Sequence, residues 1–223
     1  MIRSTVIFIS ILSLISCSSF ELRRIAPNYF DAYVNIKGSI LGFDDYPISR
    51  KFVDSIPYAS LRLKIGKGSS GLLILEEKQE NNLTYLSADN VRVVISNGKI
   101  IRTSGLDNNL VNIKEPENAF EDFLKSNKDE YSYYSYLTYD QPLLIDMKTK
   151  VTLKKIGKED VTILDLNYSL LKFQEQIENS YLGWKIVNYY WIDPVDNFIW
   201  KSQQTISPLL PLFKYQITKK PAI

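Results

Sequence analysis

The sequence predicts an all-β protein, mainly antiparallel, with a barrel-like or two-sheet β architecture and one or two short helices. Short apolar or alternating segments recur from residue 61 onward, and turn residues separate them. Segments of this kind between turn signals are typical of β-sandwiches and barrels. The sharpest turn is Asn97-Gly98, which supplies the positive φ angles of a type I′ hairpin between the expected strands 91–96 and 99–103.

The first expected strand, 61–65, alternates apolar and basic residues, which predicts one buried and one solvated face. The second, 72–75, is continuously apolar, which predicts a strand buried on both faces. The remaining expected strands are 83–86, 143–147, 151–156, 161–167, 185–192, 198–206 and 212–218.

Two segments have helical character. Residues 28–41 place apolar side chains on one face, although Gly38 weakens the helix. Residues 117–125 follow Pro116, with acidic residues early and Lys125 late, an order that complements the helix dipole. No element is assigned to 131–139, which contains five tyrosines in nine residues.

Composition excludes several classes of function. Lys and Arg total 27 and Asp and Glu total 25, so the chain lacks the basic excess of a dedicated nucleic-acid binder. Histidine is absent and there is one cysteine, which excludes imidazole catalysis, an internal disulfide and a thiolate metal site. We expect neither a metal nor a cofactor.

The first 17 residues predict a lipoprotein leader. Residues 6–15 are mostly apolar, and this run is shorter than the roughly 20 residues that span a bilayer as a helix. Leu14-Ile15-Ser16-Cys17 resembles a bacterial lipobox, with cleavage between Ser16 and Cys17 and acylation, including palmitate, of Cys17. The alternative is an ordinary secretory peptide with an incidental cysteine. Ser18 favours the outer membrane over the inner one.

This leader sets the expected domain organisation. Residues 1–16 form the signal peptide, 17–27 a lipidated tether, and 28–223 a single β-rich domain. We expect the body to lie in the periplasm.

Residues that could carry chemistry are few. The acids Asp44, Asp45, Asp89, Asp140, Asp193 and Asp196 could supply a carboxylate pair for glycoside hydrolysis, but acids are common in turns of this kind. Aromatic rings could stack on sugars, and the first candidates for glycan or partner contact are Trp191, Trp200, Tyr190 and Tyr134. The alternative, which we favour, is that these aromatics pack a β core and its rim.

An ordered set of segments resembles the YjbF/GfcB family of capsule and exopolysaccharide lipoproteins. The segments are Val-Asp-Ser-Ile-Pro-Tyr-Ala-Ser at 53–60 with the strand at 61–66, Leu-Ser-Ala-Asp at 86–89, Asn-Gly-Lys-Ile-Ile-Arg-Thr at 97–103, Gly-Leu-Asp-Asn-Asn-Leu at 105–110, Asn-Tyr-Tyr-Trp-Ile-Asp at 188–193 and Phe-Ile-Trp-Lys-Ser-Gln-Gln at 198–204. Residues 115–180 match poorly, and Asn197 stands where relatives usually have glycine.

The resemblance implies an outer-membrane lipoprotein with a mostly β, barrel-like fold that works in extracellular polysaccharide production or export. It implies no catalytic residue. The leading hypothesis is a non-enzymatic accessory that contacts export or assembly proteins or the polysaccharide itself. The alternatives are a carboxylate-based polysaccharide-modifying enzyme and a plain envelope protein-interaction module.

Overall fold

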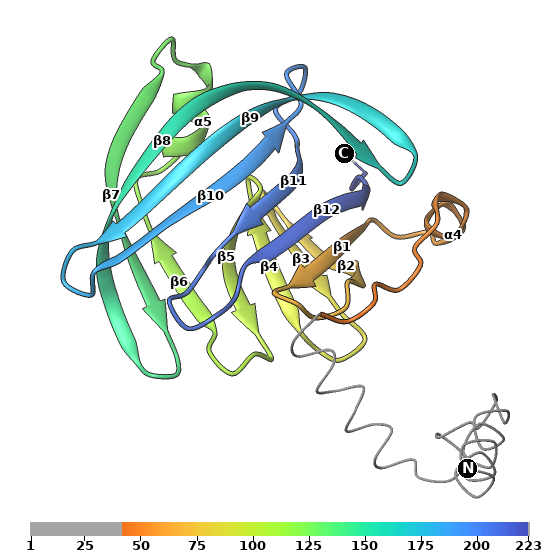
Figure 1. The fold of residues 1–223 in the computed structure, drawn as a ribbon, viewed down its shortest axis with the longest axis horizontal. Coiled ribbons are helices and arrows are strands. Elements are labelled where there is room, and N and C mark those ends of the chain that lie inside the picture. The colour runs from red at the N-terminus through yellow and green to blue at the C-terminus, as the bar shows by residue number, and fades with distance from the viewer. Residues whose placement is uncertain (1–41, 223) are drawn as a thin grey trace, which may run out of the picture. The chain divides into compact units, whose positions relative to one another are not determined.

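A computed structural model describes residues 42–222, and these form one antiparallel sheet that curls into a nearly closed barrel (Figure 1). The sheet has twelve strands in the order β5-β4-β3-β2-β1-β12-β11-β10-β9-β8-β7-β6. The prediction of a mainly antiparallel, barrel-like β fold with short helices is therefore confirmed. The predicted leader, Cys17, the tether and the predicted helix at 28–41 lie outside the described residues.

The elements are α4 (Arg50–Ser55), β1 (Ser60–Ile65), β2 (Gly71–Gln79), β3 (Asn82–Leu86), β4 (Arg92–Ser96), β5 (Lys99–Ser104), β6 (Leu110–Lys114), α5 (Ala119–Lys125), β7 (Glu130–Tyr139), β8 (Leu144–Ile163), β9 (Leu166–Asn179), β10 (Trp184–Ile192), β11 (Ile199–Gln204) and β12 (Phe213–Lys219). Within residues 42–222, no helix combines the length and apolar character that crossing a bilayer requires.

Alternation places the core where the sequence predicts it. In β1, Leu61 and Leu63 are buried, while Arg62 and Lys64, which alternate with them, are not. The Asn97-Gly98 hairpin is confirmed: both residues have positive φ, 46° and 77°, and they connect β4 to β5. The expectation that 72–75 is buried on both faces is wrong, because only Leu73 is fully buried.

The largest departure from prediction is the hairpin of β8 and β9. The expected strands 143–147 and 151–156 and the first three residues of 161–167 belong to one continuous strand, β8, which starts at Leu144. The rest of 161–167 forms the β8–β9 turn and the start of β9, and most of β9 was not predicted. A register shift between Lys155 and Gly157 divides this hairpin into two halves. In its far half, Val161, Ile163 and Leu170 pack with Trp191 in a second apolar cluster, separate from the main core.

The two edge strands of the sheet, β5 and β6, meet through side chains. The Thr103 hydroxyl accepts a hydrogen bond from the backbone N–H of Leu110 at 3.0 Å, and Arg102 Nε donates to the carbonyl of Val111 at 3.1 Å. Lys99, in β5, forms an ion pair at 2.7 Å with Glu115, just beyond β6. We call this junction the seam.

Two short helices flank the sheet. Helix α5 confirms the prediction at 117–125, and its Phe120 and Phe123 rings pack on Phe173 of β9. Helix α4 was not predicted. Its Arg50 donates to the carbonyls of Ile163 and Thr218, which attaches the far end of the β8–β9 hairpin to β12.

Antiparallel order gives the barrel two distinct ends. The turns that follow β2, β4, β6, β8 and β10 lie at one end, which we call the mouth. The turns that follow β1, β3, β5, β7, β9 and β11 lie at the other end, which we call the tip end.

Candidate functional site

A cavity of about 470 Å³ opens at the mouth. Its size lies within the range of about 300–1,000 Å³ that is usual for small-molecule sites. Apolar side chains from opposite strands and from α5 line it: Leu83, Ile95, Phe120, Leu124, Phe198, Ile199, Tyr215 and Ile217. The cavity can therefore hold the apolar face of a ligand.

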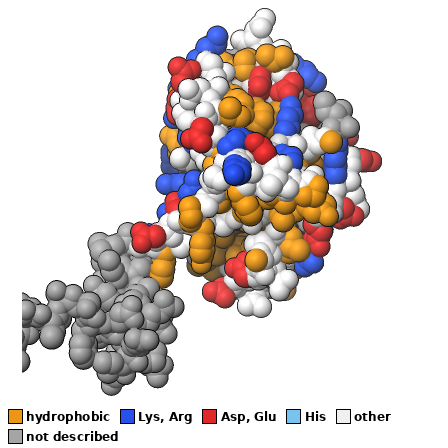
Figure 2. All heavy atoms as spheres, turned by 90° about the vertical axis from the view of Figure 1, so that its right-hand side faces the viewer, with side chains coloured by type: hydrophobic (Ala, Val, Ile, Leu, Met, Phe, Trp, Pro, Cys, Tyr) orange, Lys and Arg blue, Asp and Glu red, His pale blue; other side chains and the backbone are white. Residues whose placement is uncertain are grey.

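Charged side chains surround this apolar lining. Lys220 pairs with Asp196 at the rim and lies over the Phe198 ring, 4.5 Å from its centroid. Trp200 is not part of the lining but packs edge-on against Phe198, with centroids 5.1 Å apart. The nearby surface around α4 and the end of β12 likewise mixes exposed hydrophobic and charged side chains (Figure 2).

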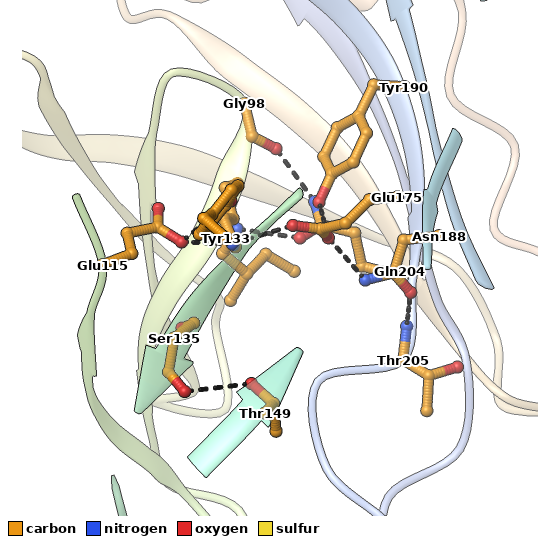
Figure 3. A network of polar contacts seen from close by, with 12 residues as sticks. Gly98, Glu115, Tyr133, Ser135, Thr149, Glu175, Asn188, Tyr190, Gln204 and Thr205 are labelled. Atoms are coloured by element: carbon orange, nitrogen blue, oxygen red, sulfur yellow. Dashed lines mark hydrogen bonds and ion pairs between the residues drawn. The ribbon is translucent and has the colours of Figure 1, made fainter. Parts of the chain in front are cut away.

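A buried ion cluster lies inside the barrel next to this cavity (Figure 3). The Lys99 ammonium contacts Glu175 at 2.8 Å and Glu115 at 2.7 Å. Glu175, on β9, is 2% exposed at its side chain, and it also accepts hydrogen bonds from Tyr190 (2.7 Å) and Asn188 (2.9 Å). The β9–β10 hairpin and β5, which is distant from it in sequence, therefore meet at one carboxylate.

In this cluster, ion pairing shifts the pKa values of Lys99 and Glu175 more strongly than burial does. Burial alone lowers the pKa of Lys99, but the charges of Glu175 and Glu115 raise it well above its ordinary value. Burial alone raises the pKa of Glu175, but Lys99 and the donors around it hold that pKa below its ordinary value. Burial beside Glu175 raises the pKa of Tyr190. Lys99 and Glu175 are therefore charged at neutral pH, and Tyr190 keeps the proton that it donates.

A second cavity, of about 140 Å³, lies along the seam above this cluster, and Lys99, Glu115 and Glu175 are among its lining residues. The Asn97 amide donates to Glu121 at 2.8 Å, and both residues line both cavities. This bond joins the β4–β5 turn to α5 between the two cavities.

Glu175 and Glu115 are not arranged as the acid pair of a glycosidase. A glycosidase needs a general acid whose pKa is raised so that it holds a proton near neutral pH, and the pKa of Glu175 is shifted the other way. Glu115 is bonded to Lys99 and Tyr133. Among residues 42–222, no three His, Cys, Asp or Glu side chains lie close enough together to hold a metal ion.

Five of the six acids considered from the sequence stabilise turns and strand ends, and the sixth, Asp44, is exposed. Asp45 binds Lys64, Arg62 and the Ser70 N–H; Asp89 binds Ser87; Asp140 binds Asn109; Asp193 binds the Val195 N–H and Trp200; Asp196 binds the Phe198 N–H and Lys220. These contacts agree with the interpretation that such acids serve turns.

The structure does not gather the four candidate contact residues into one site. Trp191 is 2% exposed, beneath the far half of the β8–β9 hairpin, and Trp200 packs at the margin of the same cluster. Tyr190, 1% exposed, points into the barrel at Glu175. Tyr134 is exposed on the outside of β7. Only Tyr134 and part of Trp200 are open to a ligand at the surface, and their contact with glycan or partner stays a prediction.

Sequence reasoning missed Lys99, Glu115 and Glu175. One signal was present for Glu175, which stands between Phe173 and Ile177 on the apolar face of an alternating segment. A charge in such a position must find a partner inside the barrel. Nothing comparable marks Lys99 or Glu115, because their pairing depends on how the seam closes.

Comparison with known proteins adds family information. A family model described as group 4 capsule polysaccharide lipoprotein gfcB, YjbF matches residues 33–217. The uncharacterized lipoprotein GfcB of Escherichia coli (strain K12) is 22% identical over 174 residues, covering 76% of this chain and 80% of that protein. The crystal structure of the hypothetical lipoprotein YmcC from Escherichia coli (K12) matches with a TM-score of 0.69 at 20% identity, covering 85% of this chain and 96% of that one. The last similarity bears on the fold alone.

Proposed function

Because the chain belongs to the YjbF family of group 4 capsule polysaccharide lipoproteins, we propose that it is a lipid-anchored, non-enzymatic accessory of capsule or exopolysaccharide production or export. The observation that carries this proposal is the family match across residues 33–217, which spans the barrel from β1 to all but the last two residues of β12. Its partners are polysaccharide export or assembly proteins, together with the polysaccharide itself.

The anchor follows from the leader. Cys17, the single cysteine of the chain, closes a lipobox-like sequence, and Ser18 after it favours the outer membrane. Several acyl chains on one residue hold a protein stably at a bilayer, which one chain does not. Tethering confines the barrel with its partners, so modest affinities suffice. The body lies on the periplasmic side in this proposal.

We expect Cys17→Ala to abolish function in cells. A strain that lacks the protein and receives this variant should show as little surface polysaccharide as the unsupplemented strain, because the barrel is no longer held at the membrane. Surface polysaccharide measured by specific antibody provides the test. The matched control is Ser16→Ala, which keeps a small residue before the cleavage site and should restore wild-type levels. Full restoration by Cys17→Ala would contradict the proposal.

The mouth cavity is the surface that we propose for contact with polysaccharide. It exposes the Phe198 and Phe120 rings, and aromatic faces bind the apolar faces of sugars. We expect capsule oligosaccharides to change the fluorescence of Trp200, because this ring packs on Phe198.

The titration should fail in Phe198→Ala, which removes a lining ring, and persist in Val195→Ala, which shortens an exposed neighbour in the same turn. The chain has three tryptophans, so a Trp200→Phe variant shows whether the fluorescence change comes from Trp200. No response to any capsule oligosaccharide, together with co-purification of secretion proteins, would instead favour a protein-interaction module.

A further inference from the structure

Exposed apolar side chains gather at the tip end of the barrel, on two hairpins that adjoin through the β8–β9 pairing. The β7–β8 hairpin carries Leu143 (67% exposed) and Ile145 (68%), and the β9–β10 turn carries Tyr181 (94%) and Leu182 (49%). Both turns project at the lower left of the body in Figure 1. Single exposed apolar residues are ordinary, but adjoining ones mark contact surfaces.

A band of tyrosine and lysine lies above these apolar tips. Across β6, β7 and β8, the register places Lys114, Tyr136 and Lys148 in one row. The Lys148 ammonium lies over the ring of exposed Tyr134, 4.1 Å from its centroid. Lys148 is three residues from Ile145, or roughly 10 Å along a strand.

The acids of this region already have partners. Asp146 pairs with Lys114 at 2.8 Å, and Asp140 accepts hydrogen bonds from Asn109. Lys185, at the start of β10, pairs with Glu178. In the contacts that the structure shows, Lys148 is directed at an aromatic ring rather than at an acid, so Lys148 presents positive charge above the apolar tips.

This layering matches the surface of a bilayer. Apolar groups of interfacial elements enter the headgroup and acyl boundary by about 5–10 Å, with Lys above them at the anionic headgroups. Tyr is enriched at the same depth. The spacing between the tips and the Tyr–Lys row agrees with that depth.

The position at which the body begins also supports contact between the tip end and the membrane. Asp45, near the start of the body, accepts hydrogen bonds from the Ser70 N–H (3.0 Å) and Lys64 (2.8 Å) beside the β1–β2 turn. This turn is at the tip end, so the body begins there and not at the mouth. Residues 18–43 join it to Cys17 and could span up to roughly 90 Å if extended, which allows the tips to reach the membrane that holds the anchor.

We propose that the tip end docks on an anionic phospholipid bilayer, with Leu143, Ile145, Tyr181 and Leu182 in the interface, so that the mouth cavity faces away from the membrane. This inference rests on the proposed anchor and adds an orientation to it. A barrel held in this way presents its cavity to partners in the periplasm instead of to lipid.

Spin labels test the orientation in the complete acylated protein. Acylation occupies Cys17, so Leu143→Cys, Tyr181→Cys and Val195→Cys each provide one free thiol, and Val195, 90% exposed in the β10–β11 turn, is the matched control at the mouth. The protein is reconstituted in vesicles of phosphatidylethanolamine and phosphatidylglycerol, recovered by flotation, and probed with oxygen and with a water-soluble nickel chelate.

We expect the ratio of oxygen to nickel accessibility to be several-fold higher at positions 143 and 181 than at 195. Flotation with all three labels equally accessible to nickel would overturn the docking and leave the anchor standing. Failure to float would overturn the anchor and the docking together.

Discussion

Lys99→Met should lower the free energy of unfolding by about 3–5 kcal/mol, the range for breaking a buried ion pair by removing one partner. The ammonium of Lys99 is the counter-ion of Glu175 and Glu115, and Glu175 is almost fully buried. Methionine fills a similar volume but leaves the carboxylate charge without its cation. Equilibrium unfolding in urea, followed by tryptophan fluorescence, measures the change.

Lys185→Met is the matched control. Lys185 also pairs with a glutamate of β9, Glu178, at 2.6 Å, but its side chain is 60% exposed and that of Glu178 is 35% exposed. Exposed pairs contribute little because water and salt screen them. We expect this variant to unfold at nearly the wild-type urea concentration. Equal losses in the two variants would show that the buried cluster has no special role.

The effect of Lys99→Met should also depend on pH. The pKa of Glu175 is lowered in the folded wild type, so its contribution to stability is present above its ordinary pKa and is lost as pH falls through the folded value. Without Lys99, burial should raise the pKa of Glu175. Protonation of Glu175 at acidic pH should then remove the unpaired buried charge and restore part of the variant's stability. The gap between wild type and variant should therefore narrow as pH falls from 7 toward 4, and a constant gap would contradict this explanation.

Gly98→Ala should be the second strongly destabilising change. Gly98 has φ +77°, and a Cβ there would lie 2.2 Å from Ile199 Cδ1 and 2.6 Å from Ile199 Cβ. The left-handed conformation costs about 1–2 kcal/mol, and the collision adds about 1–3 kcal/mol, as overpacking does. Shortening Ile199 cannot relieve it, because its own Cβ is within the collision. Moving the turn would strain the bonds that the Gly98 carbonyl accepts from Gln204 and Tyr215.

Gly183→Ala separates the two contributions. Gly183 also has positive φ, +62°, in the β9–β10 turn, but a Cβ there meets nothing within 4 Å. The Gly183→Ala variant should lose only the cost of the left-handed backbone conformation, about 1–2 kcal/mol of its free energy of unfolding. Thermal unfolding of both variants compares them directly. If Gly98→Ala lowers the stability no more than Gly183→Ala does, the β4–β5 turn accommodates the added Cβ, and the collision with Ile199 does not contribute.

Local chemistry explains which elements could be predicted. Asn97-Gly98 carries the residues that a type I′ turn demands, and alternation in β1 matches a half-buried strand. The β8–β9 turn consists of Leu164 and Asp165, both at positive φ, without the glycine or asparagine that would mark it. Because this turn signal is absent, β9 could not be predicted as a separate strand. The polar outward-facing residues of β8 interrupt its apolar pattern, so the sequence predicts several short strands in place of one long strand.

The candidate site was less predictable because it depends on contacts distant in sequence. Lys99 and Glu175 meet only when β5 reaches the seam and β9 takes its register. Tyr190 and Trp191 are neighbours in β10, yet one points at Glu175 and the other packs under the β8–β9 hairpin. An aromatic-rich segment therefore indicates buried surface before it indicates a binding face.

Metabolic labelling with radioactive palmitate tests the anchor most directly. Cells that make the wild-type chain should incorporate label into it, and cells that make Cys17→Ala at the same level should not. A wild-type chain that takes up no palmitate, or a Cys17→Ala chain that remains in the membrane fraction as fully as the wild type, would contradict the account of a barrel tethered through residue 17.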